Sequence, residues 1–376
     1  MDILLIEPYF TGSHARWAEG YKKASTHNVE ILSMAGRYWK WRMHGGAVTL
    51  ARRFLAGGFT PSLILATDML DLTTFLALTR HRTAGVPTAI YFHENQLTYP
   101  WGPLDRDAAA GRDQHYGFIN YASALAADRV FFNSRFHMES FLGALAAFLK
   151  SFPEHNEAGS VDAIRVKSTV LHLGMDFSHL DDAPPVERAG ERPLMLWNHR
   201  WEHDKNPAEF FRALYALDEK GLDFSVALLG ENFRNRPEEF EEAERRLGSR
   251  IIHSGFVRDA GEYAQWLKKA DILPVTSLHD FFGASVVEAV RCGCFPLLPE
   301  RLAYPEHFPE KYHGLFFYDG FDDLVDRLAA AVTGIERTRA VKTSHLVERY
   351  GWQEMAPAYD REMEEAARLT TKGVFR

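Results

Sequence analysis

The chain has 376 residues, a formal net charge of −8 and 46% hydrophobic residues. This length suits two domains of ordinary size, and no apolar run reaches the roughly 20 residues of a membrane-spanning helix. Only two cysteines are present, which excludes a disulfide framework and favours a cytoplasmic protein. Acids close to the N-terminus, without a basic region, argue against a secretory signal peptide.

The first half of the chain alternates apolar runs of strand length with segments of helical pattern. We predict strands at residues 3–6, 29–33, 63–66, 88–92, 130–132 and 170–173. Such alternation is typical of an α/β fold with a parallel sheet covered by helices. A stretch with two adjacent prolines and many charges follows at 181–193 and predicts a linker. The first domain is therefore expected to cover residues 1–180.

Two short segments that follow predicted strands of this first domain are candidates for ligand binding. Gly12 lies in a short loop after the first strand, where a phosphate or sugar can approach a helix start, although an ordinary turn is the alternative. His93, Glu94, Asn95 and Gln96 follow the fourth strand and predict a ligand-facing cluster. His93 and Glu94 are candidates for acid–base work, and a hydrogen-bonded structural histidine is the alternative. The absence of a G-x-G-x-x-G motif counts against a dinucleotide-dependent dehydrogenase.

Residues 31–60 contain five Lys or Arg residues and no acid, and they interleave these cations with large aromatic rings. The candidate contact residues are Arg37, Lys40, Trp41, Arg42, Arg52 and Arg53. Cations of this kind bind phosphates, and rings stack on unpaired bases, so the segment suits a nucleic acid. The alternative is partial burial of the tryptophans with the cationic heads in solvent. A helix is expected from about residue 46 to residue 54.

The second half restarts with a predicted strand at 194–197, and Pro207 is a favoured first residue of the helix that follows. Arg200 and Lys205 precede this helix on a loop that we expect to be exposed. Two cations and free helix amides can converge on a diphosphate there, although generic surface charge is the alternative.

Residues 271–300 predict a strand, a polar loop, a helix opened by Gly283 and a further strand. Asp280 in the loop and Glu288 on the helix could hold hydroxyl groups, while the first amides of the helix could bind a phosphate. The predicted ligand is a phosphate joined to a group rich in hydroxyls. Beyond it we predict a late strand at 315–318 and helices near 339–349 and 352–369.

Asp280, the seven residues after it and Glu288, with Phe282-Gly283 and Glu288-Ala289, resemble the donor-sugar motif of family-4 retaining glycosyltransferases. That family usually has Glu where this chain has Asp280. The resemblance implies a GT-B fold, with two Rossmann-like domains facing across a cleft. It makes residues 1–180 the acceptor-binding domain and 190–350 the donor-binding domain, with a C-terminal helix, about 352–376, crossing back to the first.

Three longer strings, EPYFTGSHARW, YFHENQLTYPW and WNHRWEHDKNP, resemble the tRNA-queuosine α-mannosyltransferase family. That family transfers mannose from GDP-mannose to queuosine at the tRNA wobble position. The resemblance thus implies a nucleotide-sugar donor, a tRNA acceptor, no metal or cofactor and no obligatory protein partner. It also implies that the segment from Arg37 to Arg53, with Glu94, Asn95 and Gln96, contacts the acceptor.

The resemblance also implies a role for each donor-site residue. Arg200, Lys205 and the amides after Gly283 would neutralise the departing diphosphate, and Glu288 would accept from the ribose hydroxyls. Asp280, the backbone of Phe281 and Phe282, and His93 would orient the sugar. Gly12 would admit the phosphate, and Gly255 with Phe256 would lie at the nucleotide base. Two alternatives stay open: a GT-B glycosyltransferase acting on a lipid or small molecule, and a catalytically silent module that binds a sugar nucleotide or RNA.

Overall fold

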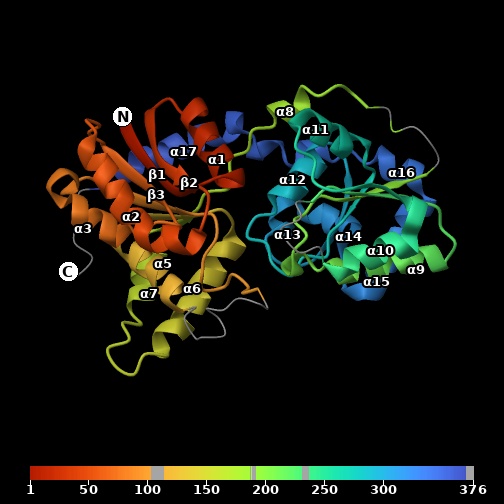
Figure 1. The fold of residues 1–376 in the computed structure, drawn as a ribbon, viewed down its shortest axis with the longest axis horizontal. Helices are drawn as coiled ribbons and strands as arrows, with labels where there is room; N and C mark the ends of the chain where they lie inside the picture. Colours follow the sequence, from red (N-terminus) through yellow and green to blue (C-terminus); the bar gives the residue numbers. More distant parts are fainter. Residues whose placement is uncertain (103–113, 187, 189–191, 231–236, 370–376) are drawn as a thin grey trace. The chain divides into compact units, whose positions relative to one another are not determined.

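The computed structural model describes residues 1–102, 114–186, 188, 192–230 and 237–369 (Figure 1). The chain forms two compact units, Met1–Asp176 with Tyr350–Arg376, and Phe177–Arg349. The division therefore falls a few residues before the predicted linker at 181–193, of which residues 187 and 189–191 lie outside the described part. Residues 370–376 of the predicted C-terminal helix also lie outside it.

The first unit is built on a six-stranded parallel sheet in the order β2-β1-β3-β4-β5-β6. Its strands are β1 (Asp2–Phe10), β2 (Asn28–Ala35), β3 (Leu63–Thr67), β4 (Thr88–Phe92), β5 (Arg129–Phe132) and β6 (Ser168–Val170). Its helices are α1 (Gly12–Ala24), α2 (Trp39–Ala56), α3 (Leu72–Thr83), α5 (Gln114–Ala126), α6 (Arg135–Lys150), α7 (Ser160–Arg165) and α17 (Trp352–Ala367). Side chains alternate between the two faces of each strand, so Leu4 and Ile6 pack in the same buried cluster as Leu50 and Phe54 of α2.

The second unit carries its own six-stranded parallel sheet in the order β12-β11-β10-β7-β8-β9. Its strands are β7 (Leu194–Trp197), β8 (Ser225–Leu228), β9 (Ile251–Ser254), β10 (Ile272–Pro274), β11 (Phe295–Pro299) and β12 (Phe317–Tyr318). Its helices are α8 (Ser178–Asp181), α9 (Pro207–Glu219), α10 (Glu238–Leu247), α11 (Ala260–Lys269), α12 (Ala284–Arg291), α13 (Tyr304–His307), α14 (His313–Phe316), α15 (Gly320–Thr333) and α16 (Ile335–Ala340). In each sheet the parallel strands bring their carboxyl ends to one edge, where ligands of open α/β sheets bind.

The predicted helix at 339–349 is wrong, because α16 ends at Ala340 and only short 3-10 turns follow before α17. The late strand is shorter than predicted, since residues 313–316 form α14 and only Phe317 and Tyr318 pair with β11. The first strand is longer, because a register irregularity between Glu7 and Phe10 lets β1 continue past Pro8. Helix α2 begins at Trp39, seven residues before the predicted start at 46.

The last helix packs on the first unit, as predicted, and hydrogen bonds to the Asp360 carboxylate hold it there. Asp360 of α17 accepts hydrogen bonds from Tyr21, from Ser25 and from both the backbone and the hydroxyl of Thr26. Trp352 lies where Gly20 and Gly174 leave room, since a Cβ on either glycine would come within 2.1 or 2.4 Å of its ring. Among the described residues, no helix is long and apolar enough to span a membrane.

Candidate functional sites

In the second unit, the loops after β7 and β10 meet at Lys205. Its Nζ lies 3.2 Å from the Asp204 carboxylate, 3.3 Å from that of Asp280 and 2.8 Å from the carbonyl oxygen of His279. Burial alone would lower the pKa of Lys205, but Asp280 and Asp204 raise it, so the ammonium group is charged. Lys205 is only 8% exposed, and the expectation that it lies on an exposed loop is therefore wrong.

The burial of Lys205 has a physical reason that changes its role. Its ammonium group donates to the His279 carbonyl and to Asp280 and forms an ion pair with Asp204, so it holds the two loops together as well as carrying charge. Arg200, in contrast, is exposed as predicted, and its guanidinium lies 3.1 Å from the carboxylate of Glu202. The two cations therefore have different environments, one inside the loop and one on its surface.

Asp280 is held as an anion at the entrance to α12. Burial alone would raise the pKa of Asp280, but the Lys205 ammonium lowers it below its ordinary value. The hydroxyl of Tyr304 donates to the same Asp280 oxygen at 3.2 Å. Gly283 has a left-handed φ of +85° at the N-cap of α12, and a Cβ there would come within 2.9 Å of the Tyr304 ring. The glycine thus lets the loop turn closely past Tyr304 into the helix.

The remaining residues predicted to bind the donor differ in their burial. Glu288 is buried on α12, and its Oε2 accepts a hydrogen bond of 2.9 Å from Tyr263 of α11. Phe281 and Phe282 are buried, and the carbonyl of Phe282 is hydrogen-bonded by His307. Gly255 has a φ of +143°, and Phe256 after it is 54% exposed at the end of β9. The exposed ring is available to a planar ligand, whereas Phe281 and Phe282 shape the loop.

One histidine of this site was not singled out from the sequence. His199 follows β7, and its Nδ1 lies 2.9 Å from the Ser285 hydroxyl at the start of α12. Burial, helped by nearby Lys205, lowers the pKa of His199 to about 4, so the ring is neutral. Its Nε2 has no hydrogen-bond partner in the described part of the chain. The signal in the sequence was its place two residues after the end of a strand, close to the position of His93 directly after β4.

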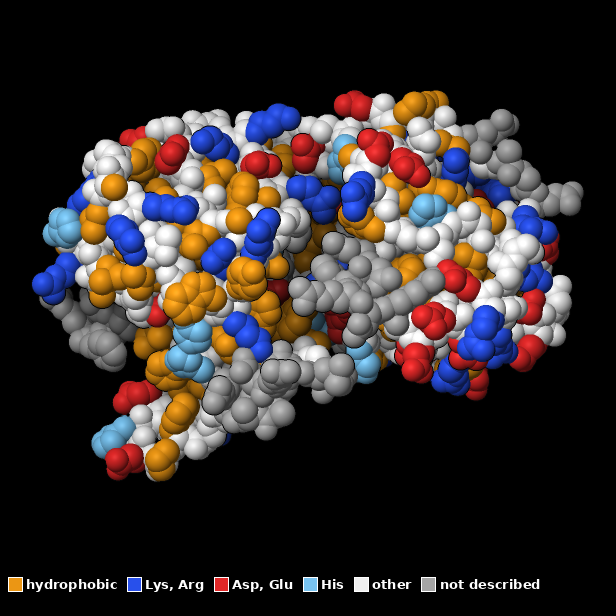
Figure 2. Space-filling view, in the orientation of Figure 1, with side chains coloured by type: hydrophobic (Ala, Val, Ile, Leu, Met, Phe, Trp, Pro, Cys, Tyr) orange, Lys and Arg blue, Asp and Glu red, His pale blue; other side chains and the backbone are white. Residues whose placement is uncertain are grey.

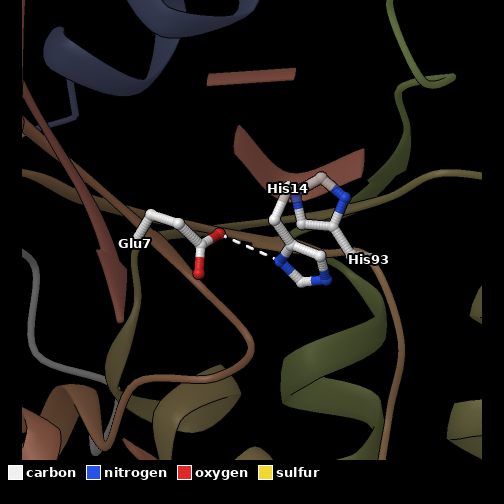
Figure 3. Close-up of side chains that lie close together, drawn as sticks. All are labelled: Glu7, His14 and His93. Carbon is white, nitrogen blue, oxygen red and sulfur yellow. Dashed lines mark hydrogen bonds and ion pairs between the residues drawn. The ribbon is translucent and has the colours of Figure 1, made fainter. Parts of the chain in front are cut away.

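In the first unit, Glu7, His14, Asp68 and His93 gather at the carboxyl edge of the sheet. Figure 3 shows Glu7 directed at His14, whose Nδ1 lies 3.0 Å from the Glu7 carboxylate, with the ring of His93 against His14. The centroids of the two imidazoles are 4.3 Å apart. Asp68 accepts a hydrogen bond from the backbone of His93. Apart from His93, these residues were not predicted as site residues, and Glu7 and Asp68 are buried almost completely.

The two histidines of this cluster differ in charge. Burial alone would lower the pKa of His14, but Glu7 raises it to about 9, so this ring is an imidazolium. Burial, with the positive charge of His14 beside it, lowers the pKa of His93 well below its ordinary value. Burial also raises the pKa of Asp68 well above its ordinary value. Glu7, His14 and His93 form the one group among the described residues that offers metal-ligand atoms within 4.8 Å of one another.

The polar string after His93 mostly stabilises its own turn. Asn95 is fully buried, and its side-chain oxygen accepts from the backbone of Leu97 and of Thr98. Gln96 donates from its side chain to Glu94 and from its backbone to Asn120. Asn95 therefore forms the turn and does not present its amide to a ligand. Gly12 has a left-handed φ of +52°, and a Cβ added there would meet nothing within 4 Å, so its surroundings are open.

The basic and aromatic segment is largely helix α2, and its cations have three kinds of environment. Arg42 donates twice to the carbonyl of Ala35, and Arg53 donates to that of Ser33, so both tie the segment to β2. The Lys40 ammonium lies over the rings of Trp39 and Trp101, 5.6 and 5.3 Å from their centroids. Arg37 and Arg52 are exposed, as are Tyr38 at 79% and Trp41 at 62%.

Family models indicate the class of protein, and solved structures share its fold. Residues 2–175 match a family model described as tRNA-queuosine alpha-mannosyltransferase N-terminal, and residues 181–344 match glycosyl transferases group 1. Sucrose-phosphate synthase from Thermosynechococcus elongatus has a TM-score of 0.71 at 15% identity, covering 97% of this chain and 98% of that one. The catalytic domain of starch synthase IV from Arabidopsis thaliana has a TM-score of 0.70 at 11% identity, covering 98% and 100%. The chain is a glycosyltransferase with the GT-B fold.

The family follows from a curated relative. The tRNA-queuosine alpha-mannosyltransferase of Drosophila melanogaster is 34% identical over 317 residues, which is 82% of this chain and 82% of that protein. The chain belongs to the tRNA-queuosine alpha-mannosyltransferase family.

Proposed function

We propose that this chain is a retaining mannosyltransferase that moves mannose from GDP-mannose to queuosine in the anticodon loop of tRNA. The observation that carries the proposal is the 34% identity to a tRNA-queuosine alpha-mannosyltransferase over 82% of both chains. The donor motif supports it, because Asp280 is kept anionic by Lys205 and Glu288 is aligned by Tyr263.

The donor binds to the second unit in this proposal. Glu288 accepts from the ribose hydroxyls, and Phe256 offers its exposed ring to the base. Arg200 and the first amides of α12 offset the charge that grows on the departing diphosphate, which is the main electrostatic task of the reaction. Lys205 acts mainly by holding Asp280 and the loop before α12 in position. By family analogy the leaving phosphate itself takes the proton of the acceptor hydroxyl, so no metal and no cofactor enter the scheme.

The acceptor binds to the first unit. Neutral His93 offers its buried Nε2, which has no hydrogen-bond partner among the described residues, to a substrate hydroxyl. Exposed Arg37 and Arg52 contact RNA phosphates, and each such contact releases counterions and makes binding depend on salt. A tRNA substrate implies a cytoplasmic enzyme, and the proposal requires no protein partner.

The test supplies GDP-mannose with tRNA that does or does not contain queuosine and measures the mass of the released nucleosides. We expect a hexose increment on queuosine and on no other nucleoside. Transfer to a lipid or a free sugar without this increment would favour a different acceptor. GDP-mannose binding without transfer to any acceptor would favour a silent binding module. Replacing GDP-mannose by other nucleotide sugars identifies the donor in the same assay.

A further inference from the structure

The outward face of helix α2 and its N-cap carry large side chains that are exposed. Residues 41, 45, 48 and 52 lie at intervals of three or four, so they line one face of the helix, and Tyr38 is its N-cap. Tyr38 and Trp41 are exposed, and Val48 is 45% exposed. Arg52 is exposed and makes no hydrogen bond or ion pair within the described part of the chain. The opposite face buries Met43, Ala47, Leu50 and Phe54.

Gly45 gives the ring of Trp41 a fixed place on this face. A Cβ at Gly45 would come within 2.4 Å of the Trp41 indole, so the ring lies directly against the helix where the glycine has no side chain. Glycine in a helix interior is unfavourable relative to alanine by about 1 kcal/mol, so its presence needs a reason. Here the missing side chain lets an indole lie across the backbone with its outer face in solvent.

Tyr38 is a second unusual feature at the same end of the helix. It has a left-handed φ of +54°, which is uncommon for a bulky residue, and the residue is 79% exposed. Packing therefore does not account for the tyrosine. Strained backbone of this kind concentrates at functional sites.

The charge around this face selects the kind of partner. The segment from residue 31 to residue 60 contains no acid, although the whole chain has a net charge of −8. Figure 2 shows Lys and Arg side chains interspersed with hydrophobic ones on the visible face of the unit that carries α2. Single-stranded nucleic acid combines unpaired bases, which stack on aromatic rings, with phosphates, which bind cations.

We propose that Tyr38 and Trp41 form a stacking platform for unpaired bases of an RNA loop, with Gly45 keeping the Trp41 ring in place and Arg37 and Arg52 binding the flanking phosphates. This inference rests on the proposed function, in which RNA is the acceptor. It adds that α2 recognises unpaired bases and not only the charge of the backbone.

Two neighbouring glycines supply a matched pair of variants. Gly45→Ala places a methyl group into the space of the Trp41 ring, whereas Gly46→Ala faces Pro8, with its nearest contact at an ordinary 3.4 Å. Both changes raise helix propensity, so neither is expected to lower the melting temperature. Gly45→Ala should weaken binding to a synthetic hairpin RNA of the anticodon arm about fivefold or more, in the range of a lost base stack. Gly46→Ala should leave this binding unchanged.

Variants of the ring test the stacking directly. Trp41→Ala should weaken binding to the hairpin by about 5- to 100-fold, and Trp41→Phe should retain most of it. A fully paired RNA duplex should lose no affinity in Trp41→Ala, because its bases are already stacked. Arg52→Ala should weaken binding to both RNAs. It should also reduce the slope of log affinity against log salt concentration by about 0.7 for single-stranded RNA.

Mannosyl transfer separates a failure of this inference from a failure of the proposed function. If Trp41→Ala and Gly45→Ala bind the hairpin and modify queuosine-containing tRNA like the unaltered protein, the platform is wrong and mannosyl transfer stands. If the unaltered protein gives no hexose increment, the proposed function fails, whatever the hairpin shows. Equal losses of affinity for the hairpin and for the duplex would mean that α2 recognises only the charge of the RNA backbone and that no base stacks on it. Selective loss of binding to anionic lipid vesicles would make the face a membrane contact.

Discussion

The Lys205 ammonium is shared by two carboxylates inside the second unit, and this position predicts two separable effects of its removal. In Lys205→Ala the largely buried carboxylates of Asp204 and Asp280, 10% and 16% exposed, lose their counter-charge, which should lower the unfolding free energy by about 3–5 kcal/mol. Arg200→Ala removes an exposed side chain and should leave the melting temperature unchanged. Both variants should reduce mannosyl transfer, Arg200→Ala by about a hundredfold, as loss of a charge facing the leaving group does.

Thermal unfolding and transfer assays on the same preparations measure both effects. Lys220→Ala is the matched control, because this exposed lysine pairs with exposed Asp326 and should affect neither quantity. A Lys205→Ala protein as stable as the unaltered chain would contradict the structural role. Normal transfer by Arg200→Ala would place the diphosphate elsewhere.

The ion pair of His14 and Glu7 predicts a dependence of stability on pH. Glu7 raises the pKa of His14 to about 9 in the folded chain, above its ordinary value of 6.5. The folded state therefore binds the proton more tightly than the unfolded state. The stabilisation is fully present below about pH 6.5 and is lost as the pH rises through about 9. Glu7→Gln should remove this dependence by lowering the pKa of His14.

Proton NMR of the His14 ring and urea unfolding at several pH values measure the two quantities. Glu30→Gln serves as the control, because Glu30 is about half exposed and lies 3.7 Å from Lys22. Its removal should leave the pKa of His14 unchanged. A pKa of His14 near 6.5 in the unaltered protein would contradict the ion pair.

At the scale of elements, the entrance to α12 depends on one glycine. In Gly283→Ala, the alanine must adopt a φ of +85°, and its Cβ must displace the ring of Tyr304. The hydroxyl of Tyr304 donates a hydrogen bond to Asp280. We expect a loss of about 1–3 kcal/mol in unfolding free energy from the strained backbone. Nucleotide-diphosphate binding should weaken as well, because the first amides of α12 move with the loop.

Calorimetry with GDP and urea unfolding test this prediction. Gly143→Ala is the control, since Gly143 is exposed within α6 and a Cβ there would meet nothing within 4 Å. That change should stabilise the chain by up to about 1 kcal/mol through helix propensity. Unchanged GDP affinity in Gly283→Ala would mean that this loop is not part of the phosphate-binding site.

Elements with a local signal could be predicted from the sequence. Ser134 caps α6 by accepting from the backbone of His137, and Pro207 begins α9, both as the sequence indicates. The burial of Lys205 could not be predicted, because its partner Asp280 is 75 residues away. The role of Asn95 in forming the turn could not be predicted, because polar residues after a strand have the same sequence pattern whether they bind a ligand or form a turn. The helix predicted near 339–349 is wrong, because the chain forms short 3-10 turns at 344–346 and 348–350.

At the scale of the whole molecule, the two units have separate sheets, and the chain's C-terminal helix is part of the first. Asp360 joins α17 to α1 and the turn after it through four accepted hydrogen bonds. Burial alone would raise the pKa of Asp360, but hydrogen bonds from Ser25 and Thr26 lower it. Asp360→Ala leaves those donors without an acceptor, which should destabilise the first unit by about 3 kcal/mol or more.

Hydrogen exchange followed by mass spectrometry tests where this loss appears. In Asp360→Ala, exchange should rise in α1 and α17, while the sheet of the second unit keeps its protection, because local opening follows cooperative units. Asp326→Ala provides the control, since its carboxylate on α15 is 75% exposed and pairs with exposed Lys220, so its loss should change exchange in neither unit. A uniform rise across both sheets in Asp360→Ala would mean that the two units unfold together. In that case the C-terminal helix would stabilise the whole chain and not the first unit alone.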